Sequence, residues 1–305
     1  MRAVITVENL RKVYGQVVAV DGMSFEVYEG EIFGMVGPNG AGKTTAIECV
    51  EGLRSPDGGT VRVLGLDPVR DRVRVMTRVG VQLQTSNLPP RLKVREIMDM
   101  FRSFYPSTVD PADLLDRLGL ADKRDAFYER LSGGQKQRLF IALALLNDPE
   151  IVFLDELTTG LDPQARLTMW EMVQEIRERG KTIFLTTHYM EEAERLCDRV
   201  AIVHRGRIVA LDTPANLIRQ VDVPVRVALD VLTPLNVAVL EALPSVTRVQ
   251  VNGSHVVLHG TQESALVEIV QALTAQRVRF TNLHVTQPTL EDVFLAVTGG
   301  VTITD

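Results

Sequence analysis

The sequence is poor in cysteine and aromatic residues, and it has no long apolar run. Only two of its 305 residues are cysteines, Cys49 and Cys197, and neither has a CxxC or CxxH neighbour. This excludes a disulfide framework and argues against a zinc site, so both thiols are expected to lie reduced in or near the core. No apolar stretch approaches the ~20 residues that cross a bilayer, and charges come too early for a signal peptide. We therefore expect a cytoplasmic chain that reaches a membrane only through a partner.

The composition excludes several further classes of protein. Hydrophobic residues make up 45% and charged residues 24%, as in soluble globular proteins, so neither a disordered chain nor a repeat array is indicated. The net charge of −6, from 33 basic and 39 acidic residues, argues against nucleic acid as the main partner. A length of 305 residues suggests one large domain or two smaller ones.

Strand and helix patterns alternate over the first 220 residues. Two segments with alternating polarity and four more apolar ones are predicted to be strands: Val4–Val7, Ser24–Val27, Ile32–Val36, Ile151–Leu154, Thr182–Thr186 and Val200–Val203. Helices are predicted at Thr44–Leu53, over most of Val94–Leu146 with Pro106 and Pro111 as breakers, and at Leu167–Arg179 and Met190–Cys197. Apolar strands that alternate with helices indicate an α/β fold with a central, mainly parallel sheet.

The pattern changes after about residue 220. Strands are predicted at Val225–Leu229, Val246–Val251, His255–His259 and Val278–Val285, and helices at Asn236–Leu243, Ser264–Gln276 and Leu290–Val297. The order βαββαβα is close to a split βαβ, ferredoxin-like α+β unit. A linker is expected near residues 219–224, which gives one domain at 1–220 and a second, accessory domain at 225–305.

A glycine-rich segment follows the first buried strand and precedes a helical pattern. Residues 37–44 fit the phosphate-loop pattern GxxxxGK[ST]. Glycines let the backbone wrap closely around phosphate oxygens, and the N-terminus of the following helix favours an anion. Lys43 is expected to reach the β- and γ-phosphates of a nucleoside triphosphate, and the Thr44 hydroxyl to bind Mg²⁺. The predicted nucleotide-binding residues are Gly37, Pro38, Asn39, Gly40, Ala41, Gly42, Lys43, Thr44 and Thr45.

Two adjacent carboxylates end the apolar strand at residues 151–154. Asp155 is in the place of a carboxylate associated with Mg²⁺ beside bound phosphates. Glu156, one residue further, is placed to polarise an attacking water. Solvated acids at a strand end would be the simpler interpretation of this pair alone, but the phosphate loop in the same chain favours a catalytic one.

The segment Leu131-Ser132-Gly133-Gly134-Gln135 begins another helical pattern. Ser132 and Gln135 have the spacing of a capping box, and the two glycines leave the helix N-terminus open to a second phosphate contact. This segment resembles the signature sequence that distinguishes ABC ATPases from other phosphate-loop proteins. The resemblance implies that Ser132, Gly133, Gly134 and Gln135 contact ATP.

The resemblance to ABC ATPases implies roles for further residues. Gln84 resembles the glutamine that contacts Mg²⁺ and senses the transmembrane partner, although Gln82 competes for that assignment. His188 resembles the histidine that holds the γ-phosphate and supports the water, so that Glu156, His188 and Lys43 form the predicted catalytic set. Asp162 lies in a segment similar to the D-loop that crosses the dimer interface. Tyr14 matches the aromatic residue that stacks on adenine; a tyrosine packed at the surface is the alternative.

The resemblance covers about residues 3–220, with every motif in order. It implies a phosphate-loop NTPase cassette with a RecA-like core, an antiparallel β subdomain and a helical subdomain. One residue departs from the family pattern, because Leu157 stands where proline usually follows the catalytic glutamate. Proline would fix the backbone there, and leucine removes no ligand. The tail resembles the C-terminal domain of daunorubicin-resistance-type export ATPases, down to residues 289–294.

The family implies a subunit that binds and hydrolyses ATP, with Mg²⁺, to drive an exporter. A drug-like or lipophilic substrate would pass through a separate transmembrane permease, to which the chain binds at the cytoplasmic face of the membrane. Each ATP would lie between Lys43 of one copy and Ser132 of a second, so a single cassette predicts a head-to-tail homodimer. A membrane partner is expected to dock around residues 84–94 and the following helix.

A soluble ABC ATPase that acts on ribosomes or nucleic acid is the alternative. Such relatives carry two cassettes on one chain or long insertions between the phosphate loop and the signature. This chain has one cassette, and the segment from Thr44 to Leu131 contains neither a coiled coil nor a zinc finger. A non-catalytic regulatory ATPase is disfavoured because the site residues are all present.

Overall fold

The computed structural model describes residues 2–82, 88–221, 225–260 and 264–298. The chain forms two compact units, Met1–Pro214 and Ala215–Gly300. This division falls just before the linker expected near residues 219–224; the domain limits 1–220 and 225–305 stay a prediction. In the part of the chain that the structure describes, no helix has the length and apolar character needed to span a bilayer.

A six-stranded sheet forms the centre of the first unit. Its strands, in the order β5-β6-β7-β3-β8-β9, are β3 (Ile32–Val36), β5 (Val79–Gln82), β6 (Ile151–Asp155), β7 (Thr182–Thr187), β8 (Arg199–His204) and β9 (Arg207–Asp212). All pairs are parallel except β8 with β9. Every residue of β3, β6 and β7 is buried, because helices and a second sheet cover this sheet. The predicted, mainly parallel α/β sheet is thus confirmed.

A second, antiparallel sheet has the order β2-β1-β4. Its strands are β1 (Ala3–Tyr14), β2 (Val17–Tyr28) and β4 (Gly58–Val63). β1 and β2 are far longer than the alternating segments predicted in them, and their pairing contains several register shifts. Each shift turns the strand and interrupts the polar–apolar alternation, which explains why the sequence pattern covers only part of each strand.

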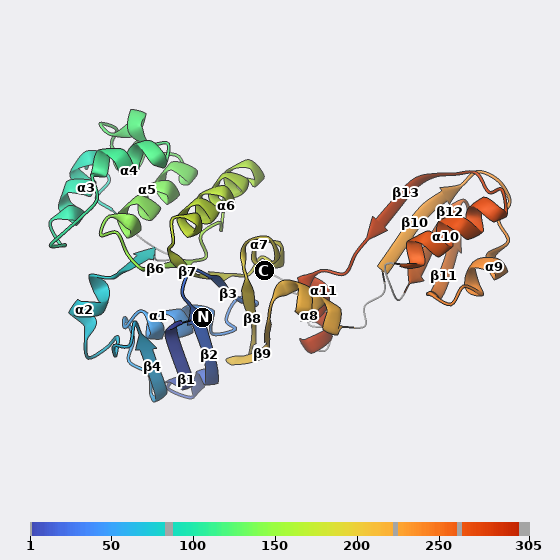
Figure 1. Cartoon of the computed structure of the whole chain (residues 1–305). Coiled ribbons are helices and arrows are strands. Elements are labelled where there is room, and N and C mark those ends of the chain that lie inside the picture. The colour runs from blue at the N-terminus through green and yellow to red at the C-terminus, as the bar shows by residue number, and fades with distance from the viewer. Residues whose placement is uncertain (1, 83–87, 222–224, 261–263, 299–305) are drawn as a thin grey trace. The chain divides into compact units, whose positions relative to one another are not determined.

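The helices of the first unit surround these sheets. They are α1 (Lys43–Val50), α2 (Arg72–Met76), α3 (Val94–Arg102), α4 (Pro111–Arg117), α5 (Gly133–Leu145), α6 (Pro163–Glu178) and α7 (Met190–Leu196), with short 3₁₀ turns at Ala121–Lys123 and Tyr128–Arg130. Helices α3, α4 and α5 gather at one end of this unit, and β1, β2 and β4 lie at the opposite end (Figure 1). The unit thus has the helical and antiparallel parts that the family resemblance implies.

One hydrophobic core joins the two sheets of the first unit. Phe25 of β2 stacks on Phe33 of β3 at a centroid distance of 5.3 Å, and Phe184 of β7 meets Phe33 edge-on at 5.4 Å. The buried side of α1 belongs to the same cluster. Cys49 and Cys197 are both buried and free, as predicted, and burial raises the pKa of the Cys49 thiol to about 11. Because β3 and α1 both pack in this core, the phosphate loop that joins them begins and ends on rigid elements.

The second unit has the predicted order of strands and helices. It begins with α8 (Pro214–Gln220) and continues with β10 (Val225–Val231), α9 (Val237–Glu241), β11 (Val246–Asn252), β12 (His255–Gly260), α10 (Ser264–Ala275), β13 (Phe280–Thr286) and α11 (Leu290–Thr298). The antiparallel sheet has the order β11-β12-β10-β13. Its four strands therefore lie in the ferredoxin-like order fourth, first, third, second. Helices α9 and α10 pack on one face of this sheet.

Two prolines begin helices in the first unit. The sequence pattern predicts that Pro111 breaks a helix, but it is the first residue of α4, where Asp110 accepts a hydrogen bond from Ala112 N at 2.8 Å. Likewise α6 begins at Pro163, before the predicted start at Leu167. Proline at a first helical position has no amide that needs a partner, and its φ suits the helix. A capping residue followed by proline therefore marks the first residue of these two helices better than the apolar pattern does.

Candidate nucleotide site

The phosphate loop connects β3 to α1 and is held against neighbouring backbone. Gly42, the N-cap of α1, has a φ of 103° in the left-handed region. A Cβ atom on Gly42 would lie 2.3 Å from the carbonyl oxygen of Ala19, and one on Gly37 would lie 2.2 Å from that of Val203. Both positions therefore require glycine, because backbone atoms cannot move aside as a flexible side chain can. The first amides of α1 remain available to an anion.

The other predicted loop residues lie in the same turn. Ala41 N donates to the carbonyl oxygen of Pro38 at 3.1 Å, which closes the turn. Asn39 and Gly40 are exposed at its tip, and Thr45 is half-buried in the first turn of α1. The structure thus brings all nine predicted residues into one loop and helix start, with an exposed tip that a ligand can approach.

Lys43 is buried and its ammonium group faces the loop. Nζ donates to the carbonyl oxygens of Gly37 at 2.8 Å and Pro38 at 3.1 Å, and it lies 3.7 Å from Glu156 Oε1. Burial lowers the pKa of Lys43, and the nearby carboxylates of Glu156 and Asp155 oppose that shift. The ammonium is thus held between the loop and the end of β6 by contacts that a phosphate oxygen could replace.

Asp155 lies at the end of β6 between two hydroxyl groups. Thr44 Oγ1 donates to Asp155 Oδ1 at 3.5 Å, and the Thr186 hydroxyl of β7 donates to the same oxygen. Burial raises the pKa of the Asp155 carboxyl; Glu156 adds to this shift, while the two hydroxyls and Lys43 oppose it. A hydroxyl and a carboxylate oxygen that converge in this way fit Mg²⁺, which prefers oxygen ligands and takes the rest from phosphates and water.

Glu156 joins the phosphate loop to the next strand. Its Oε1 lies 3.7 Å from Lys43 Nζ and 3.7 Å from His188 Nδ1. Its backbone N–H bonds to Thr186, at 3.1 Å to the carbonyl oxygen and 3.2 Å to Oγ1. The predicted catalytic set of Lys43, Glu156 and His188 therefore converges on one carboxylate oxygen, although its members lie on α1, after β6 and after β7.

The signature segment forms the start of α5. Ser132 N donates to Gln135 Oε1 at 2.9 Å and Gln135 N donates to Ser132 Oγ at 3.3 Å, so the predicted capping box is confirmed. Ser132 and Gly133 are exposed, and Gly134 is half-buried. Among the described residues, the side-chain hydrogen bonds of Ser132 and Gln135 are to each other's backbone and not to the phosphate loop. The N-terminus of α5 is therefore open to solvent, and a ligand that binds there would approach it from solvent.

Both parts of this chain are similar to known proteins. Residues 20–159 match the family model described as ABC transporter, and residues 225–298 match the ATP-binding protein DrrA1-3-like, C-terminal domain. Nod factor export ATP-binding protein I of Paraburkholderia xenovorans is 41% identical over 97% of both chains. Its namesake from Cupriavidus metallidurans is 40% identical over 98% of both. The chain belongs to the family of ABC transporter ATP-binding proteins.

Solved structures agree with this ABC ATPase assignment. An ATP binding subunit of an ABC transporter is 29% identical, with a TM-score of 0.65 over 71% of this chain and 92% of the other. A bacterial ABC transporter cassette solved as a dimer is 25% identical, with a TM-score of 0.61 over 68% of this chain and 98% of the other. The cassette fold, the ATPase class and the export-type C-terminal domain predicted from the sequence are thus confirmed.

Two further predicted residues of the ABC ATPase, Tyr14 and Asp162, lie outside this cluster. Tyr14, 39% exposed at the end of β1, has Lys12 Nζ and Arg54 Cζ at 5.6 and 5.5 Å from its ring centroid. Asp162 caps α6 by accepting from Ala165 N at 2.9 Å. Their proposed nucleotide contacts stay predictions.

Gln84 and Gln82 compete for the role of the glutamine in the partner-sensing loop. Gln84 lies outside the described residues. Gln82 is the last residue of β5 and is buried, with 3% of its surface exposed. The choice between the two glutamines therefore stays a prediction.

Leu157 and Thr186 complete the environment of the two carboxylates. Leu157 is buried, and the turn after Glu156 is closed by Thr159 N, which donates to the Glu156 carbonyl oxygen at 3.2 Å. Thr186 was not predicted as a site residue, although it bonds to both Asp155 and Glu156. Thr186 and Thr187 follow the apolar run of the buried strand β7, and this pair of hydroxyl residues at the strand end is the signal that could have identified Thr186.

Proposed function

We propose that this ABC ATPase is the subunit that binds and hydrolyses ATP for an exporter. It acts as a head-to-tail homodimer that binds separate permease subunits at the cytoplasmic face of a membrane. The substrate class proposed is a drug-like or lipophilic compound, as the subgroup resemblance implies. The relatives named above are called Nod factor export proteins, which supports export as the direction.

The convergence of Lys43 and His188 on one oxygen of Glu156 carries the proposal of hydrolysis. With ATP in the loop, Lys43 moves from the carbonyl oxygens it now contacts to the β- and γ-phosphates. Glu156 then accepts a hydrogen bond from the attacking water. His188 contacts the γ-phosphate and helps to hold that water in place. Phosphoryl transfer needs little covalent help from the protein, so positioning and charge neutralisation dominate the rate.

Thr44 and Asp155 are the residues proposed to hold Mg²⁺. The ion neutralises phosphate charge when bound. The Thr186 hydroxyl orients Asp155, because it donates to the same carboxylate oxygen that Thr44 contacts. Gln84 is proposed as a further contact of the ion. This assignment predicts that Thr44 and Asp155 affect the metal dependence of turnover more strongly than Thr45 does.

The exposed cap of α5 supports the homodimer. The Ser132 and Gln135 side chains already satisfy one another's backbone amides. The amides of Gly133 and Gly134 are left at an open helix N-terminus, where an anion is favoured. In a head-to-tail pair, the γ-phosphate held by Lys43 of one copy reaches this start of α5 in the other. Because two copies grip each ATP, binding closes the dimer and hydrolysis releases it.

The substitution Glu156→Gln tests the proposed role of the carboxylate. It keeps the shape of the side chain but removes its charge and basicity, so steady ATP turnover should fall by at least about 100-fold. The variant should still bind ATP and, unable to hydrolyse it, accumulate as an ATP-bound dimer. Turnover is measured by phosphate release, and the dimer by light scattering after gel filtration with and without MgATP.

Glu178→Gln is a matched control, because Glu178 is an exposed glutamate at the end of α6, far along the chain from the loop. The control should hydrolyse ATP at the wild-type rate and stay monomeric under turnover. Turnover of Glu156→Gln close to wild type would remove Glu156 from its role. A variant that binds ATP, does not hydrolyse it and stays monomeric would instead contradict the dimer.

Affinity purification from solubilised membranes tests the transport assignment. The tagged Glu156→Gln chain with MgATP should recover a multi-span membrane protein in stoichiometric amount. Recovery of ribosomes without a membrane protein would refute the exporter and favour the soluble alternative.

A further inference from the structure

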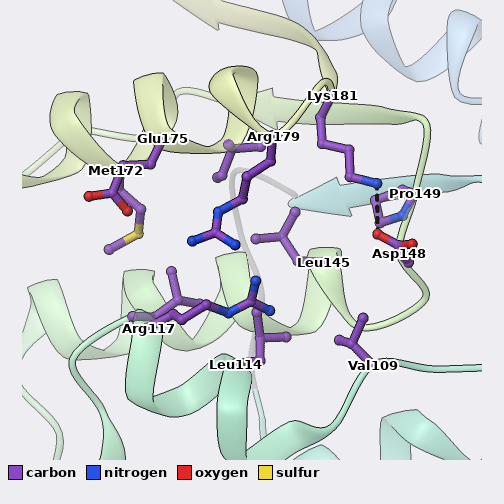
Figure 2. Close-up of a pocket in the computed structure, with 12 residues that line it drawn as sticks. Val109, Leu114, Arg117, Leu145, Asp148, Pro149, Met172, Glu175, Arg179 and Lys181 are labelled. Atoms are coloured by element: carbon purple, nitrogen blue, oxygen red, sulfur yellow. Dashed lines mark hydrogen bonds and ion pairs between the residues drawn. The ribbon is translucent and has the colours of Figure 1, made fainter.

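A pocket of about 290 Å³ lies in the first unit, away from the residues of the nucleotide site. It is bordered by α4, the last turn of α5, the second half of α6 and the segments before β6 and β7. Figure 2 shows the pocket with its lining side chains drawn as sticks. Its lining combines charged side chains with apolar ones, and the apolar residues Leu114, Leu118, Met172, Ile176 and Pro149 are all buried. None of the twelve lining residues has a role in the proposed nucleotide chemistry.

Two arginines extend into this pocket from opposite walls. Arg117 comes from α4 and Arg179 from the end of α6, and their guanidinium groups point toward one another in Figure 2. Within the described residues, neither side chain has a hydrogen bond, ion pair or aromatic partner. The third cation of the pocket differs, because Lys181 Nζ is paired with Asp148 Oδ1 at 2.7 Å.

Glu175 is the remaining charged residue of the lining. It stands one helical turn before Arg179 on α6, the spacing at which a glutamate and an arginine commonly pair. The two side chains nevertheless make no ion pair, and Figure 2 shows the Arg179 side chain directed toward Arg117 instead. Two exposed guanidinium groups therefore point toward one another over the pocket, and among the described residues neither is paired with a carboxylate. Their repulsion is relieved if an anion lies between them.

We propose that this pocket binds a small organic anion with an apolar body. Its phosphate or carboxylate group lies between Arg117 and Arg179, whose forked guanidinium groups each match two oxygens of such an anion. Its apolar part lies against Leu114 and Met172. A cavity that joins apolar side chains to a few convergent polar groups is typical of ligand sites, and 290 Å³ is just below their usual size.

The pocket lies against the C-terminal parts of α5 and α6, the two helices of the proposed dimer interface. Leu145 is the last residue of α5, whose first turn carries the signature cap, and Met172 and Ile176 belong to α6, whose N-cap is Asp162. A ligand in the pocket thus contacts the far ends of the two helices whose N-termini are proposed to face the second copy. The proposal of a binding site does not depend on export or on ATP turnover.

Calorimetric titration of the full chain with phenyl phosphate and with benzoate tests the site. Saturating MgADP is present, so that the phosphate loop is already filled. The wild-type chain should bind at least one probe, and the stronger of the two identifies a phosphate or a carboxylate headgroup. Arg117→Gln and Arg179→Gln should each weaken binding about tenfold, because each removes charge-assisted hydrogen bonds. Inorganic phosphate, which lacks the apolar body, should bind at least tenfold more weakly than phenyl phosphate.

The double variant Arg102→Gln/Arg124→Gln is the matched control. Both are exposed arginines of the same helical part, and neither lines the pocket. The control should bind the probes as the wild type does. Equal affinity of the wild type and Arg117→Gln/Arg179→Gln would overturn the proposal. The absence of binding by both probes at millimolar concentration, or binding of inorganic phosphate as tightly as phenyl phosphate, would overturn it as well.

Discussion

The acid–base state of Glu51 gives a prediction that can be worked out from the structure. Glu51 is the C-cap of α1 and has no exposed surface. Neither carboxyl oxygen has a hydrogen-bond partner among the described residues. Burial raises the pKa of this carboxyl well above its usual range, and the charges of Asp155 and Glu48 add to the shift. The partial negative charge at a helix C-terminus opposes a carboxylate too. We therefore expect Glu51 to keep its proton in the folded chain to pH values well above those at which an exposed glutamate ionises.

This state makes the stability of the first unit depend on pH with a definite sign. In the unfolded chain Glu51 loses its proton at an ordinary pKa, whereas in the folded chain it keeps the proton to a higher pH. The folded state thus binds more protons between these two pKa values, and the free energy of unfolding falls as the pH rises. The slope is at most about 1.4 kcal/mol per pH unit. Glu51→Gln has a similar shape and cannot ionise, so it removes this term alone.

The expected result is a stability difference that grows with pH. Relative to the wild type, Glu51→Gln should gain up to about 1.4 kcal/mol for each pH unit above the ordinary pKa of a glutamate, until the raised pKa of the folded chain is passed. Urea unfolding followed by fluorescence measures it, because Trp170 is the only tryptophan of the chain and is buried in the same unit. Glu178→Gln should show no such trend. A difference between Glu51→Gln and the wild type that stays constant from pH 5 to 8 would refute a protonated Glu51.

Three further substitutions test other parts of the first unit. Gly37→Ala places a Cβ 2.2 Å from the Val203 carbonyl oxygen, so calorimetry should show weaker MgATP binding and urea unfolding a loss of about 1–3 kcal/mol. Asp162→Ala removes the cap of α6 and should cost about 1 kcal/mol of unfolding free energy; no loss would mean that the cap is immaterial. Trp170→Phe leaves buried Glu192 without the indole donor now at 2.9 Å, and circular dichroism should report a loss of about 1–3 kcal/mol.

Features that depend only on residues close together in the chain could be predicted from the sequence. The phosphate loop and the capping box at Ser132 depend on residues a few positions apart, and the structure has both. The apolar runs Ile32–Val36 of β3 and Ile151–Leu154 of β6 are buried as their composition predicts. In the second unit, turn residues and alternating strands were enough to give the order of all seven elements from β10 to α11.

Features that depend on contacts between distant residues could not be predicted in this way. Thr186 acts on Asp155 across two paired strands, and nothing near either residue specifies that pairing. The pocket is another case, because Arg117 and Arg179 line one cavity only once α4 lies near the end of α6. The register shifts of β1 likewise belong to its pairing with β2 and β4, which lie far from much of β1 in the sequence. In each case the sequence supplies the residue type, and the tertiary fold supplies its partner.

The backbone at Glu156 explains how two adjacent carboxylates can serve one site. In a regular strand, neighbouring side chains point to opposite faces. Glu156 has a φ of 50°, in the left-handed region that costs a non-glycine residue about 1–2 kcal/mol, and this ends the alternation after Asp155. The two bonds from its N–H to Thr186 and the turn closed by Thr159 hold it there. Because Leu157 is not proline, it places no pre-proline restriction on Glu156, and its buried side chain anchors the turn instead. The departure from the family pattern is thus compatible with an active site, since the strained residue is the proposed catalytic one.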